Sequence, residues 1–163
     1  MVFLHFWANA NNAGRGATPA LRHPHQGLVL IVDDNPVNRL VAARAVNRLG
    51  YLTEVVSSGA QALEAVAASR FDVILLDCQM PGMGGYQTAL EIRRREAGQG
   101  HIPIIAATAK TMEGDQEKCL ASGMDDYLLK PIRFAGLEAA LDRWVAHPAP
   151  VAPPLLFQNS PGD

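Results

Sequence analysis

Short apolar runs alternate with longer amphipathic segments through the middle of the chain. Bounded by polar residues, Gly or Pro, such runs are typical of strands that are buried on both faces of a parallel sheet. Five of them occur, at residues 28–32, 53–56, 73–77, 102–108 and 126–130. Because a helical segment follows each predicted strand, right-handed crossovers should give an α/β fold whose parallel sheet is covered by helices on both faces.

Local sequence signals mark where the predicted helices begin and end. Pro36 suits the first turn of the first helix and Gly50 its end, Ser58 can cap the second helix, and Gly123 follows the fourth. The arginines at 93–95 suit the C-terminus of the third helix, where we expect a solvated end. The first helix is predicted from apolar residues at helical spacing, namely Val37, Leu40, Val41, Ala45, Val46 and Leu49.

The two ends differ from this alternating region. Residues 1–26 mix Asn, Gly, Pro, Arg and His with the short apolar run VFLHFW, and residues 147–163 are rich in proline. Because proline can neither continue a helix nor fill a central strand, we expect a linker or disordered segment at 1–26, one domain at 27–146 and a disordered tail at 147–163. Hydrophobic residues make up 48% of the 163 residues, which is enough for a globular core.

Charge and cysteine content exclude several classes of protein. A net charge of -2 gives no electrostatic basis for binding nucleic acid. No apolar run approaches the ~20 residues that cross a bilayer, and the first residues lack the basic start of a signal peptide, so we expect no membrane contact. Cys78 and Cys119 lack metal-like spacing, are expected only to pack, and favour a reduced, intracellular protein.

Carboxylates, a hydroxyl and a lysine stand at the ends of the predicted strands. Asp33 and Asp34 follow the first strand, Asp77 ends the third, Thr108 the fourth and Lys130 the fifth. Parallel strands present their carboxyl ends at one edge of a sheet, so these residues can meet there. Three carboxylates repel one another without a cation, and oxygen ligands suit Mg²⁺, while a hydroxyl and an ammonium suit phosphate oxygens. The set predicts phosphoryl transfer onto a carboxylate.

Some of these residues also have a plainer interpretation. Asp33 and Asp34 could cap the helix that follows them, and Thr108 could satisfy a turn. Tyr127, inside the fifth strand, could be a simple strand former. The agreement of several strand ends favours the phosphoacceptor site over these interpretations.

Four segments of the chain resemble the receiver domain of two-component response regulators. They are LVLIVDDNPVNR, VILLDCQMPGMGGY, IIAATA and DDYLLKPI, and the resemblance spans about residues 28–146. It implies a flavodoxin-like fold with strand order 2-1-3-4-5 and five flanking helices. By motif, Asp77 is similar to the phosphoacceptor, and Asp33 and Asp34 resemble the acidic pair that holds Mg²⁺ together with Asp77 and the backbone carbonyl of Gln79.

The resemblance implies roles for other residues at the same edge. Thr108 resembles the switch hydroxyl, Lys130 the phosphate-contacting lysine and Tyr127 the rotating aromatic that reports phosphorylation. The peptide bond before Pro131 resembles the cis peptide of the family. Lys110 stands where relatives of this kind often carry Asn, and we hypothesise that Lys110 and Gln79 set the lifetime of the phosphoryl group.

The motifs are most similar to receivers attached to hybrid sensor histidine kinases. This implies a phosphorelay in which Asp77 accepts a phosphoryl group from the phosphohistidine of a histidine kinase, in the same parent chain, and passes it to a histidine phosphotransfer domain. VFLHFW would then be a remnant of the kinase domain. Such a receiver catalyses only its own phosphorylation and dephosphorylation. It is expected to lie in the cytoplasm even where its parent protein is membrane-anchored. A homodimer is possible.

Three alternatives stay open at the level of sequence. A stand-alone response regulator that signals through protein contacts is the nearest. A degenerate receiver that only docks partners is disfavoured, because no acidic residue or lysine of the motif is missing. A hydrolase of the related aspartyl-phosphate type would need a second acid two residues after Asp77, where Gln79 stands.

Overall fold

The structure, a computed structural model, describes residues 27–96, 98, 100–109 and 113–145. Within these residues strands and helices alternate, as the apolar pattern predicted. The strands are Leu28–Val32 (β1), Leu52–Val56 (β2), Val73–Asp77 (β3), Ile104–Thr108 (β4) and Asp126–Leu129 (β5). The helices are Pro36–Arg48 (α1), Gly59–Ala68 (α2), Gly85–Glu96 (α3), Glu113–Ala121 (α4) and Phe134–Trp144 (α5). The predictions for 1–26 and 147–163 lie outside the described residues.

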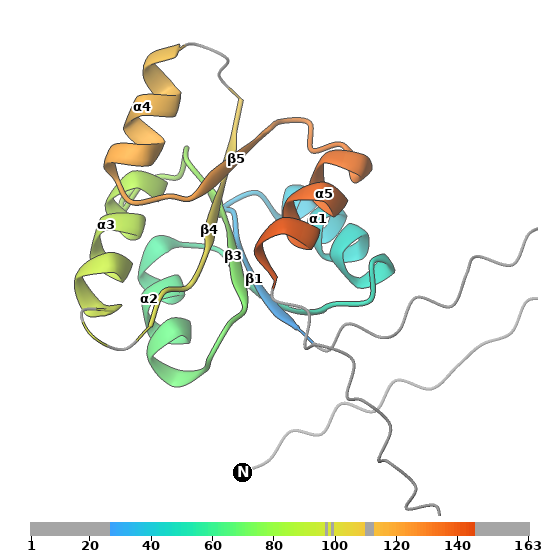
Figure 1. Cartoon of the computed structure of the whole chain (residues 1–163), viewed down its shortest axis with the longest axis horizontal. Coiled ribbons are helices and arrows are strands. Elements are labelled where there is room, and N and C mark those ends of the chain that lie inside the picture. The colour runs from blue at the N-terminus through green and yellow to red at the C-terminus, as the bar shows by residue number, and fades with distance from the viewer. Residues whose placement is uncertain (1–26, 97, 99, 110–112, 146–163) are drawn as a thin grey trace, which may run out of the picture.

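The strands form one parallel sheet in the order β2-β1-β3-β4-β5 (Figure 1). β3 occupies the centre between β1 and β4 and is buried along its whole length. Because all strands run the same way, their carboxyl ends lie at one edge of the sheet and their amino ends at the opposite edge. The predicted fold class and strand order are confirmed.

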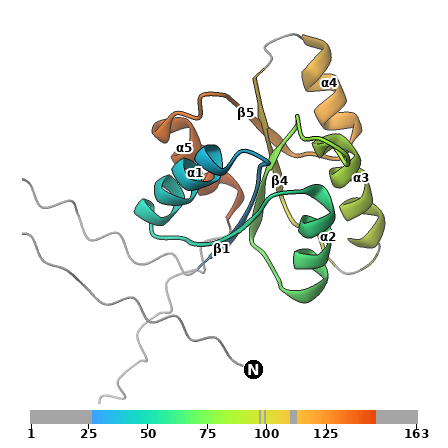
Figure 2. The same ribbon diagram turned by 180° about the vertical axis from the view of Figure 1, so that it is seen from behind.

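Helices cover both faces of the sheet (Figures 1 and 2). On one face, Val46 of α1 and Leu137 of α5 belong to the same core as Val29 of β1. On the other face, Ile92 of α3 belongs to a second core with Leu30 of β1, to which α2 and α4 also contribute. Neighbouring residues of a strand point to opposite faces, so each of the three central strands, β1, β3 and β4, supplies both cores. This is why the central strands are continuous apolar runs in the sequence, whereas the edge strands β2 and β5 include polar residues.

Side chains fix the start of the first two helices. The carboxamide oxygen of Asn35 accepts hydrogen bonds from two backbone N–H groups of the first turn of α1, at 2.8 and 3.3 Å, and Pro36 stands at the first helical position. Ser58 caps α2 in the same way. The predictions for Pro36 and Ser58 are confirmed. The cap of α1 is Asn35 rather than Asp33 or Asp34, because Asn35 stands directly before the helix, where a side-chain oxygen reaches the free N–H groups.

The apolar residues that predicted α1 do not all face the core. Val46 and Leu49 are buried, whereas Val37, Leu40 and Val41 are 64%, 52% and 59% exposed. The exposed three stand at positions i, i+3 and i+4 and therefore share one face of the helix, which we call the α1 strip. Since α1 carries apolar residues on more than one face, spacing alone could not identify the face that packs against the sheet.

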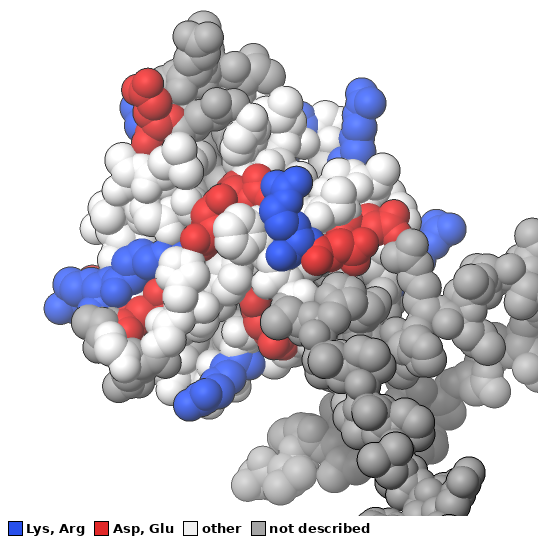
Figure 3. Space-filling model, in the orientation of Figure 1, with Lys and Arg blue, Asp and Glu red and all other residues white. Residues whose placement is uncertain are grey.

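Charged side chains of both signs are interspersed on the surface. On the face shown in Figure 3, Lys and Arg lie next to Asp and Glu. Arg143 and Asp126, for example, form an ion pair of 2.8 Å. Among the residues that the structure describes, none of the helices has the length and apolar content needed to cross a bilayer.

Candidate functional site

Lys130 joins two carboxylates at the carboxyl edge of the sheet. Its ammonium group donates to Asp33 Oδ2 at 2.9 Å and lies 2.8 Å from Asp77 Oδ2. Asp33 directly follows β1, Asp77 ends β3 and Lys130 directly follows β5. The parallel sheet thus brings together side chains that are up to 97 positions apart in the sequence.

Asp34 completes a cluster of three carboxylates. Asp33, Asp34 and Asp77 each offer an oxygen atom, and these oxygens all lie within 4.8 Å of one another. Asp33 and Asp77 are buried while Asp34 is exposed, so solvent reaches the cluster from the side of Asp34. Lys130 neutralises only part of the charge. Hard oxygen donors with an excess of negative charge fit a divalent cation such as Mg²⁺, which the sequence predicted for these residues.

The environment of Lys130 keeps it charged. Burial alone lowers the pKa of an ammonium group, but hydrogen bonds to Asp77 and Asp33, and the charges of these carboxylates, outweigh that effect and raise the pKa of Lys130. The side chain remains 21% exposed. Lys130 is therefore a cation at neutral pH that can still reach an incoming anionic group.

The turn between β1 and α1 is held from the helix side. The Asn38 amide donates to both carboxylate oxygens of Asp33, at 3.3 and 3.2 Å. The Arg39 guanidinium donates to the backbone carbonyls of Asp33 and Asp34, at 2.7 and 2.9 Å. The sequence pattern gave Asn38 and Arg39 no role. Their position in the first turns of the helix that follows the acidic pair is the signal that could have found them.

The turn after β3 shapes the surroundings of Asp77. The backbone N–H of Gln79 donates to Asp77 Oδ1 at 3.0 Å, while Lys130 contacts Oδ2, so each carboxylate oxygen has its own partner. The Gln79 side chain is exposed, which agrees with a role through its backbone. At Gly85 a Cβ would collide with the carbonyl oxygen of Asp77, so only glycine allows α3 to start against this turn.

The remaining predicted site residues lie on β4 and β5. Thr108 ends β4, is buried, and its carbonyl accepts a hydrogen bond from the backbone N–H of Lys130 at 2.8 Å. Tyr127 lies in β5 with 39% of its surface exposed. The peptide bond between Lys130 and Pro131 is cis. Lys110 lies outside the described residues.

The two cysteines pack in the core that α2, α3 and α4 share with the sheet. Cys78, next to Asp77, and Cys119 of α4 are both buried there. Burial, and then the neighbouring Cys119, raise the pKa of Cys78 to about 12. A thiol with such a high pKa stays protonated and is a poor nucleophile. The cysteines therefore fill space, as the sequence indicated.

Comparison with known proteins identifies the family of this chain. The sequence model of the response regulator receiver domain matches residues 29–142. The chain belongs to the receiver domain family. The resemblance inferred from its four motifs is thereby confirmed.

The proteins similar to this chain include sensor kinases. The chain is 41% identical over 128 residues to the sensor protein GacS of Pseudomonas syringae pv. syringae, covering 75% of this chain and 14% of that protein. It therefore spans only a small part of this relative. The receiver domain of the sensor histidine kinase PA1611 from Pseudomonas aeruginosa, solved with a magnesium ion in its active site cleft, is 43% identical, with a TM-score of 0.68 and coverage of 74% of this chain and 98% of that one.

A further similar structure contains a complex. It is the co-crystal structure of the Saccharomyces cerevisiae histidine phosphotransfer protein Ypd1 and the receiver domain of its downstream response regulator Ssk1. The matched chain is 27% identical, with a TM-score of 0.70 and coverage of 74% of this chain and 89% of that chain. The fold of this chain is thus shared with receivers of both kinds, within sensor kinases and within response regulators.

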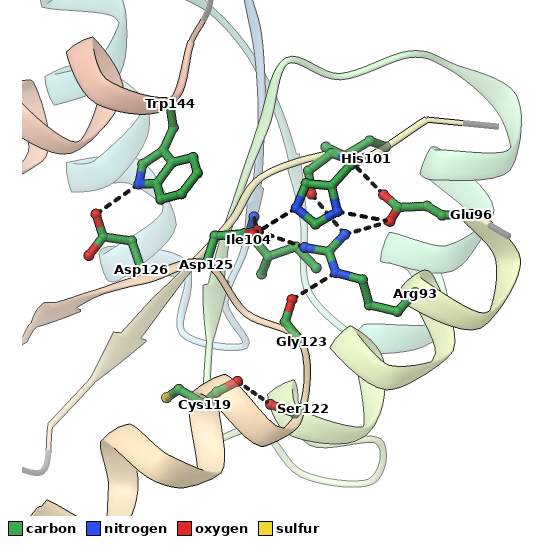
Figure 4. Close-up of polar contacts among 11 residues, drawn as sticks. Arg93, Glu96, His101, Ile104, Cys119, Ser122, Gly123, Asp125, Asp126 and Trp144 are labelled. Atoms are coloured by element: carbon green, nitrogen blue, oxygen red, sulfur yellow. Dashed lines mark hydrogen bonds and ion pairs between the residues drawn. The ribbon is translucent and has the colours of Figure 1, made fainter. Parts of the chain in front are cut away.

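A second charged cluster of the receiver lies at the amino edge of the sheet. Arg93 of α3 forms ion pairs with Glu96, at 2.6 Å, and with Asp125, at 2.7 Å, and donates to the backbone carbonyls of Gly123 and Ile102, at 2.7 and 2.9 Å (Figure 4). This guanidinium ties the end of α3 to the segments that lead into β4 and β5.

The prediction of a solvated helix end at 93–95 is wrong for Arg93. Its side chain is 18% exposed, against 74% for Arg94 and 47% for Arg95, which pair with Glu91 on the surface of α3. The cause is the tertiary contact with Asp125, a partner 32 positions away that no local pattern indicates.

Every carboxylate oxygen of Glu96 and Asp125 has a polar partner within the protein. Besides Arg93, the backbone N–H of Ile102 donates to Glu96 at 2.7 Å and the backbone N–H of Ile104 to Asp125 at 2.8 Å. The Nε2 atom of His101 lies 2.7 Å from the other oxygen of Asp125 (Figure 4). These acids therefore tie the end of α3 to the segments before β4 and β5 and stabilise the fold.

Proposed function

We propose that this receiver domain accepts a phosphoryl group from a phosphohistidine onto Asp77, with Mg²⁺ held by the acids around it. The observation that carries the proposal is the place of the Asp77 carboxylate at the end of the central strand. It lies 2.8 Å from the Lys130 ammonium, and its oxygen belongs to the same cluster as those of Asp33 and Asp34. A carboxylate so placed can act as a nucleophile toward phosphorus with positive charge close by.

These contacts suit a direct transfer of the phosphoryl group from histidine to Asp77. An oxygen of Asp77 attacks phosphorus in line with the bond to the histidine nitrogen; the new O–P bond forms as the P–N bond breaks, and its electron pair stays on the imidazole. Lys130, kept charged by its raised pKa, can donate to the phosphoryl oxygens. Asp33, Asp34, Asp77 and the backbone carbonyl of Gln79 would hold Mg²⁺, which, when bound, offsets the charge of the phosphoryl oxygens.

Thr108 and Tyr127 would report the phosphorylated state. We assign the Thr108 hydroxyl, at the end of β4, to the phosphoryl group, and Tyr127, exposed on the edge strand β5, to a change of side-chain position. The surface of β4, α4 and β5 would carry the change to partners. Gln79 is exposed beside Asp77, and Lys110 stands two residues after Thr108, so both are proposed to control the approach of the water that hydrolyses the phosphoryl group.

The α1 strip supports a protein as the phosphoryl partner. Val37, Leu40 and Val41 begin three residues after Asp34, so exposed aliphatic surface stands beside the acidic pair. Contiguous exposed apolar groups favour contact with another protein. The Ypd1–Ssk1 structure pairs a receiver with a histidine phosphotransfer protein. We therefore assign a histidine phosphotransfer domain as the relay partner of this receiver.

The parent protein is proposed to be a hybrid sensor histidine kinase. The similar protein GacS is a sensor protein, and the PA1611 receiver is a domain of a sensor histidine kinase. The kinase of the parent would be the first phosphoryl donor, and this domain would lie in the cytoplasm. The alternative is a stand-alone response regulator. Phosphoryl return from Asp77 to a histidine phosphotransfer protein favours the relay, and transfer in one direction alone favours the alternative.

Phosphotransfer tests the role of Asp77. A radiolabelled histidine phosphotransfer protein is mixed with the full chain, with Asp77→Ala and, as a control, with Asp142→Ala, which removes an exposed carboxylate from α5. We expect Mg²⁺-dependent label on the wild type and on the Asp142 variant and none on the Asp77 variant. Label that persists in Asp77→Ala would overturn the assignment.

Beryllofluoride, which mimics an aspartyl phosphate, tests the switch. With Mg²⁺ it should shift the amide NMR signals of Thr108 and Tyr127 in the wild type and leave them unchanged in Asp77→Ala. Unchanged signals in the wild type would remove Thr108 and Tyr127 from the switch without affecting the role of Asp77.

A further inference from the structure

Asn38 and Arg39 hold the acidic pair in two different ways. Asn38 bonds to the carboxylate of Asp33, whereas Arg39 bonds to the backbone, through one nitrogen that bridges the carbonyls of Asp33 and Asp34 at 2.7 and 2.9 Å. The first fixes the direction of a carboxylate, and the second fixes the two peptide units that carry the pair. Neither residue is needed to cap α1, because Asn35 does so.

We propose that Asn38 and Arg39 are positioning residues, which hold Asp33 and Asp34 in the arrangement that selects Mg²⁺ over larger cations. This inference rests on the proposed metal site. The physical reason is that Mg²⁺ demands near-octahedral coordination at short distances, while Ca²⁺ accepts varied geometries and ligand numbers. A pair of acids that is free to move therefore loses more affinity for Mg²⁺ than for Ca²⁺.

Removing Arg39 distinguishes positioning from simple electrostatics, because the two predict opposite changes in Mg²⁺ affinity. It is a cation that stands close to a cation site, so electrostatics alone predicts tighter binding of Mg²⁺ once it is removed. Positioning predicts the opposite, because its two carbonyl bonds are lost. Arg44, exposed on the same helix, is a matched control that removes the same charge from α1 without touching the turn.

Calorimetric titration with MgCl₂ and with CaCl₂ measures both affinities on the full chain. We expect Asn38→Ala and Arg39→Ala to weaken Mg²⁺ binding about tenfold, as is typical when residues that orient metal ligands are lost. Ca²⁺ binding should weaken clearly less. Arg39→Lys, which keeps the charge and can donate to one carbonyl, should be intermediate, and Arg44→Ala should bind Mg²⁺ at least as tightly as the wild type.

The outcomes separate this inference from the proposed function. A wild-type chain that binds no Mg²⁺ would remove the metal site itself. A wild-type chain that binds Mg²⁺, with variants that bind it equally well or lose both cations to the same extent, would overturn only the positioning role. Asn38→Ala leaves both backbone bonds of Arg39 intact, so it tests the inference even where Arg39→Ala does not fold.

Discussion

The two edges of the sheet carry acidic clusters that are built in opposite ways. At the amino edge, the two carboxylates of Glu96 and Asp125 share Arg93, and each of their oxygens has a polar partner from the protein. At the carboxyl edge, three carboxylates stand together with Lys130 as the cation in contact with two of them. The first cluster, which we call saturated, has one cation for two carboxylates, whereas the second, which we call unsaturated, has one cation for three and keeps the larger excess of negative charge.

The difference indicates which cluster serves the fold and which serves a ligand. Charges taken out of water are tolerated in a fold when partners and hydrogen bonds replace the water. The amino edge meets that condition by itself. At the carboxyl edge the oxygens of the buried Asp33 and Asp77 also have partners, but three carboxylates share one lysine, so they retain mutual repulsion that a bound cation would relieve. Among the described residues, the carboxyl-edge trio is also the group whose oxygens lie close enough to share a metal ion.

Breaking the saturated cluster should have the largest effect on stability. Arg93→Ala leaves Glu96 and Asp125, 12% and 15% exposed, without their cation, and we expect a loss of about 3 kcal/mol in the free energy of unfolding. Urea denaturation measures it. Arg94→Ala, which removes a 74% exposed arginine from the same helix, should cost far less. Equal effects of the two variants would contradict the comparison.

Filling the unsaturated cluster should have the next largest effect. Mg²⁺ at a concentration 100 times its dissociation constant should stabilise the wild type by about 2.7 kcal/mol, because it binds only the folded state. Urea denaturation with Mg²⁺ or with EDTA measures this increment. Arg93→Ala should show the same increment, since its cluster lies at the opposite edge, while Asp77→Asn should show little. An increment that disappears in Arg93→Ala would mean that the two edges are coupled.

The strands and the residues at the carboxyl edge could be predicted from the sequence. The central strands were predictable because burial on both faces leaves continuous apolar runs, as in β3. The carboxyl-edge residues were predictable because parallel strands end at one edge, so Asp33, Asp77 and Lys130 could be placed together without any knowledge of their contacts. Both arguments need only local sequence and one topological rule.

What the sequence did not reveal depends on tertiary contacts. Arg93 was taken for a solvated residue because Asp125 stands 32 positions away. Arg39 acts on backbone carbonyls, which every residue carries, so no side-chain pattern points to it. The exposure of Leu40 could not be predicted because α1 has apolar residues on more than one face, and packing selected the other one.

Removing one carboxylate from the unsaturated cluster should raise stability when no metal is present. Asp77→Asn keeps the shape of the side chain, takes away one of three like charges and leaves Asp33 as the partner of Lys130, so in EDTA we expect a gain of about 1 kcal/mol in the free energy of unfolding. Urea denaturation in EDTA measures it. The corresponding change at the amino edge, Asp125→Asn, should destabilise, because it removes one of the two carboxylates that pair with the largely buried Arg93, where fewer like charges repel one another. Two changes of the same sign would refute the distinction between the clusters.

The smallest expected effect is a difference between Lys130 and Arg93 in how their contributions to stability depend on alkaline pH. The pKa of Lys130 is raised in the folded state, so its pair with Asp33 and Asp77 contributes fully below the ordinary lysine pKa of about 10.4 and fades as the pH rises through the higher folded-state pKa. In EDTA the cost of Lys130→Met, expected to be about 0.5 kcal/mol at pH 8 for a partly exposed pair, should therefore shrink in alkali. Arginine stays protonated there, so the cost of Arg93→Ala should not change.

Urea denaturation of both variants and the wild type, from neutral to alkaline pH, measures the two costs as differences. Groups that titrate in all three proteins cancel in these differences. A cost of Lys130→Met that stays constant would show that Lys130 contributes through packing rather than through its charge, and that the carboxyl edge is less electrostatic than its geometry indicates.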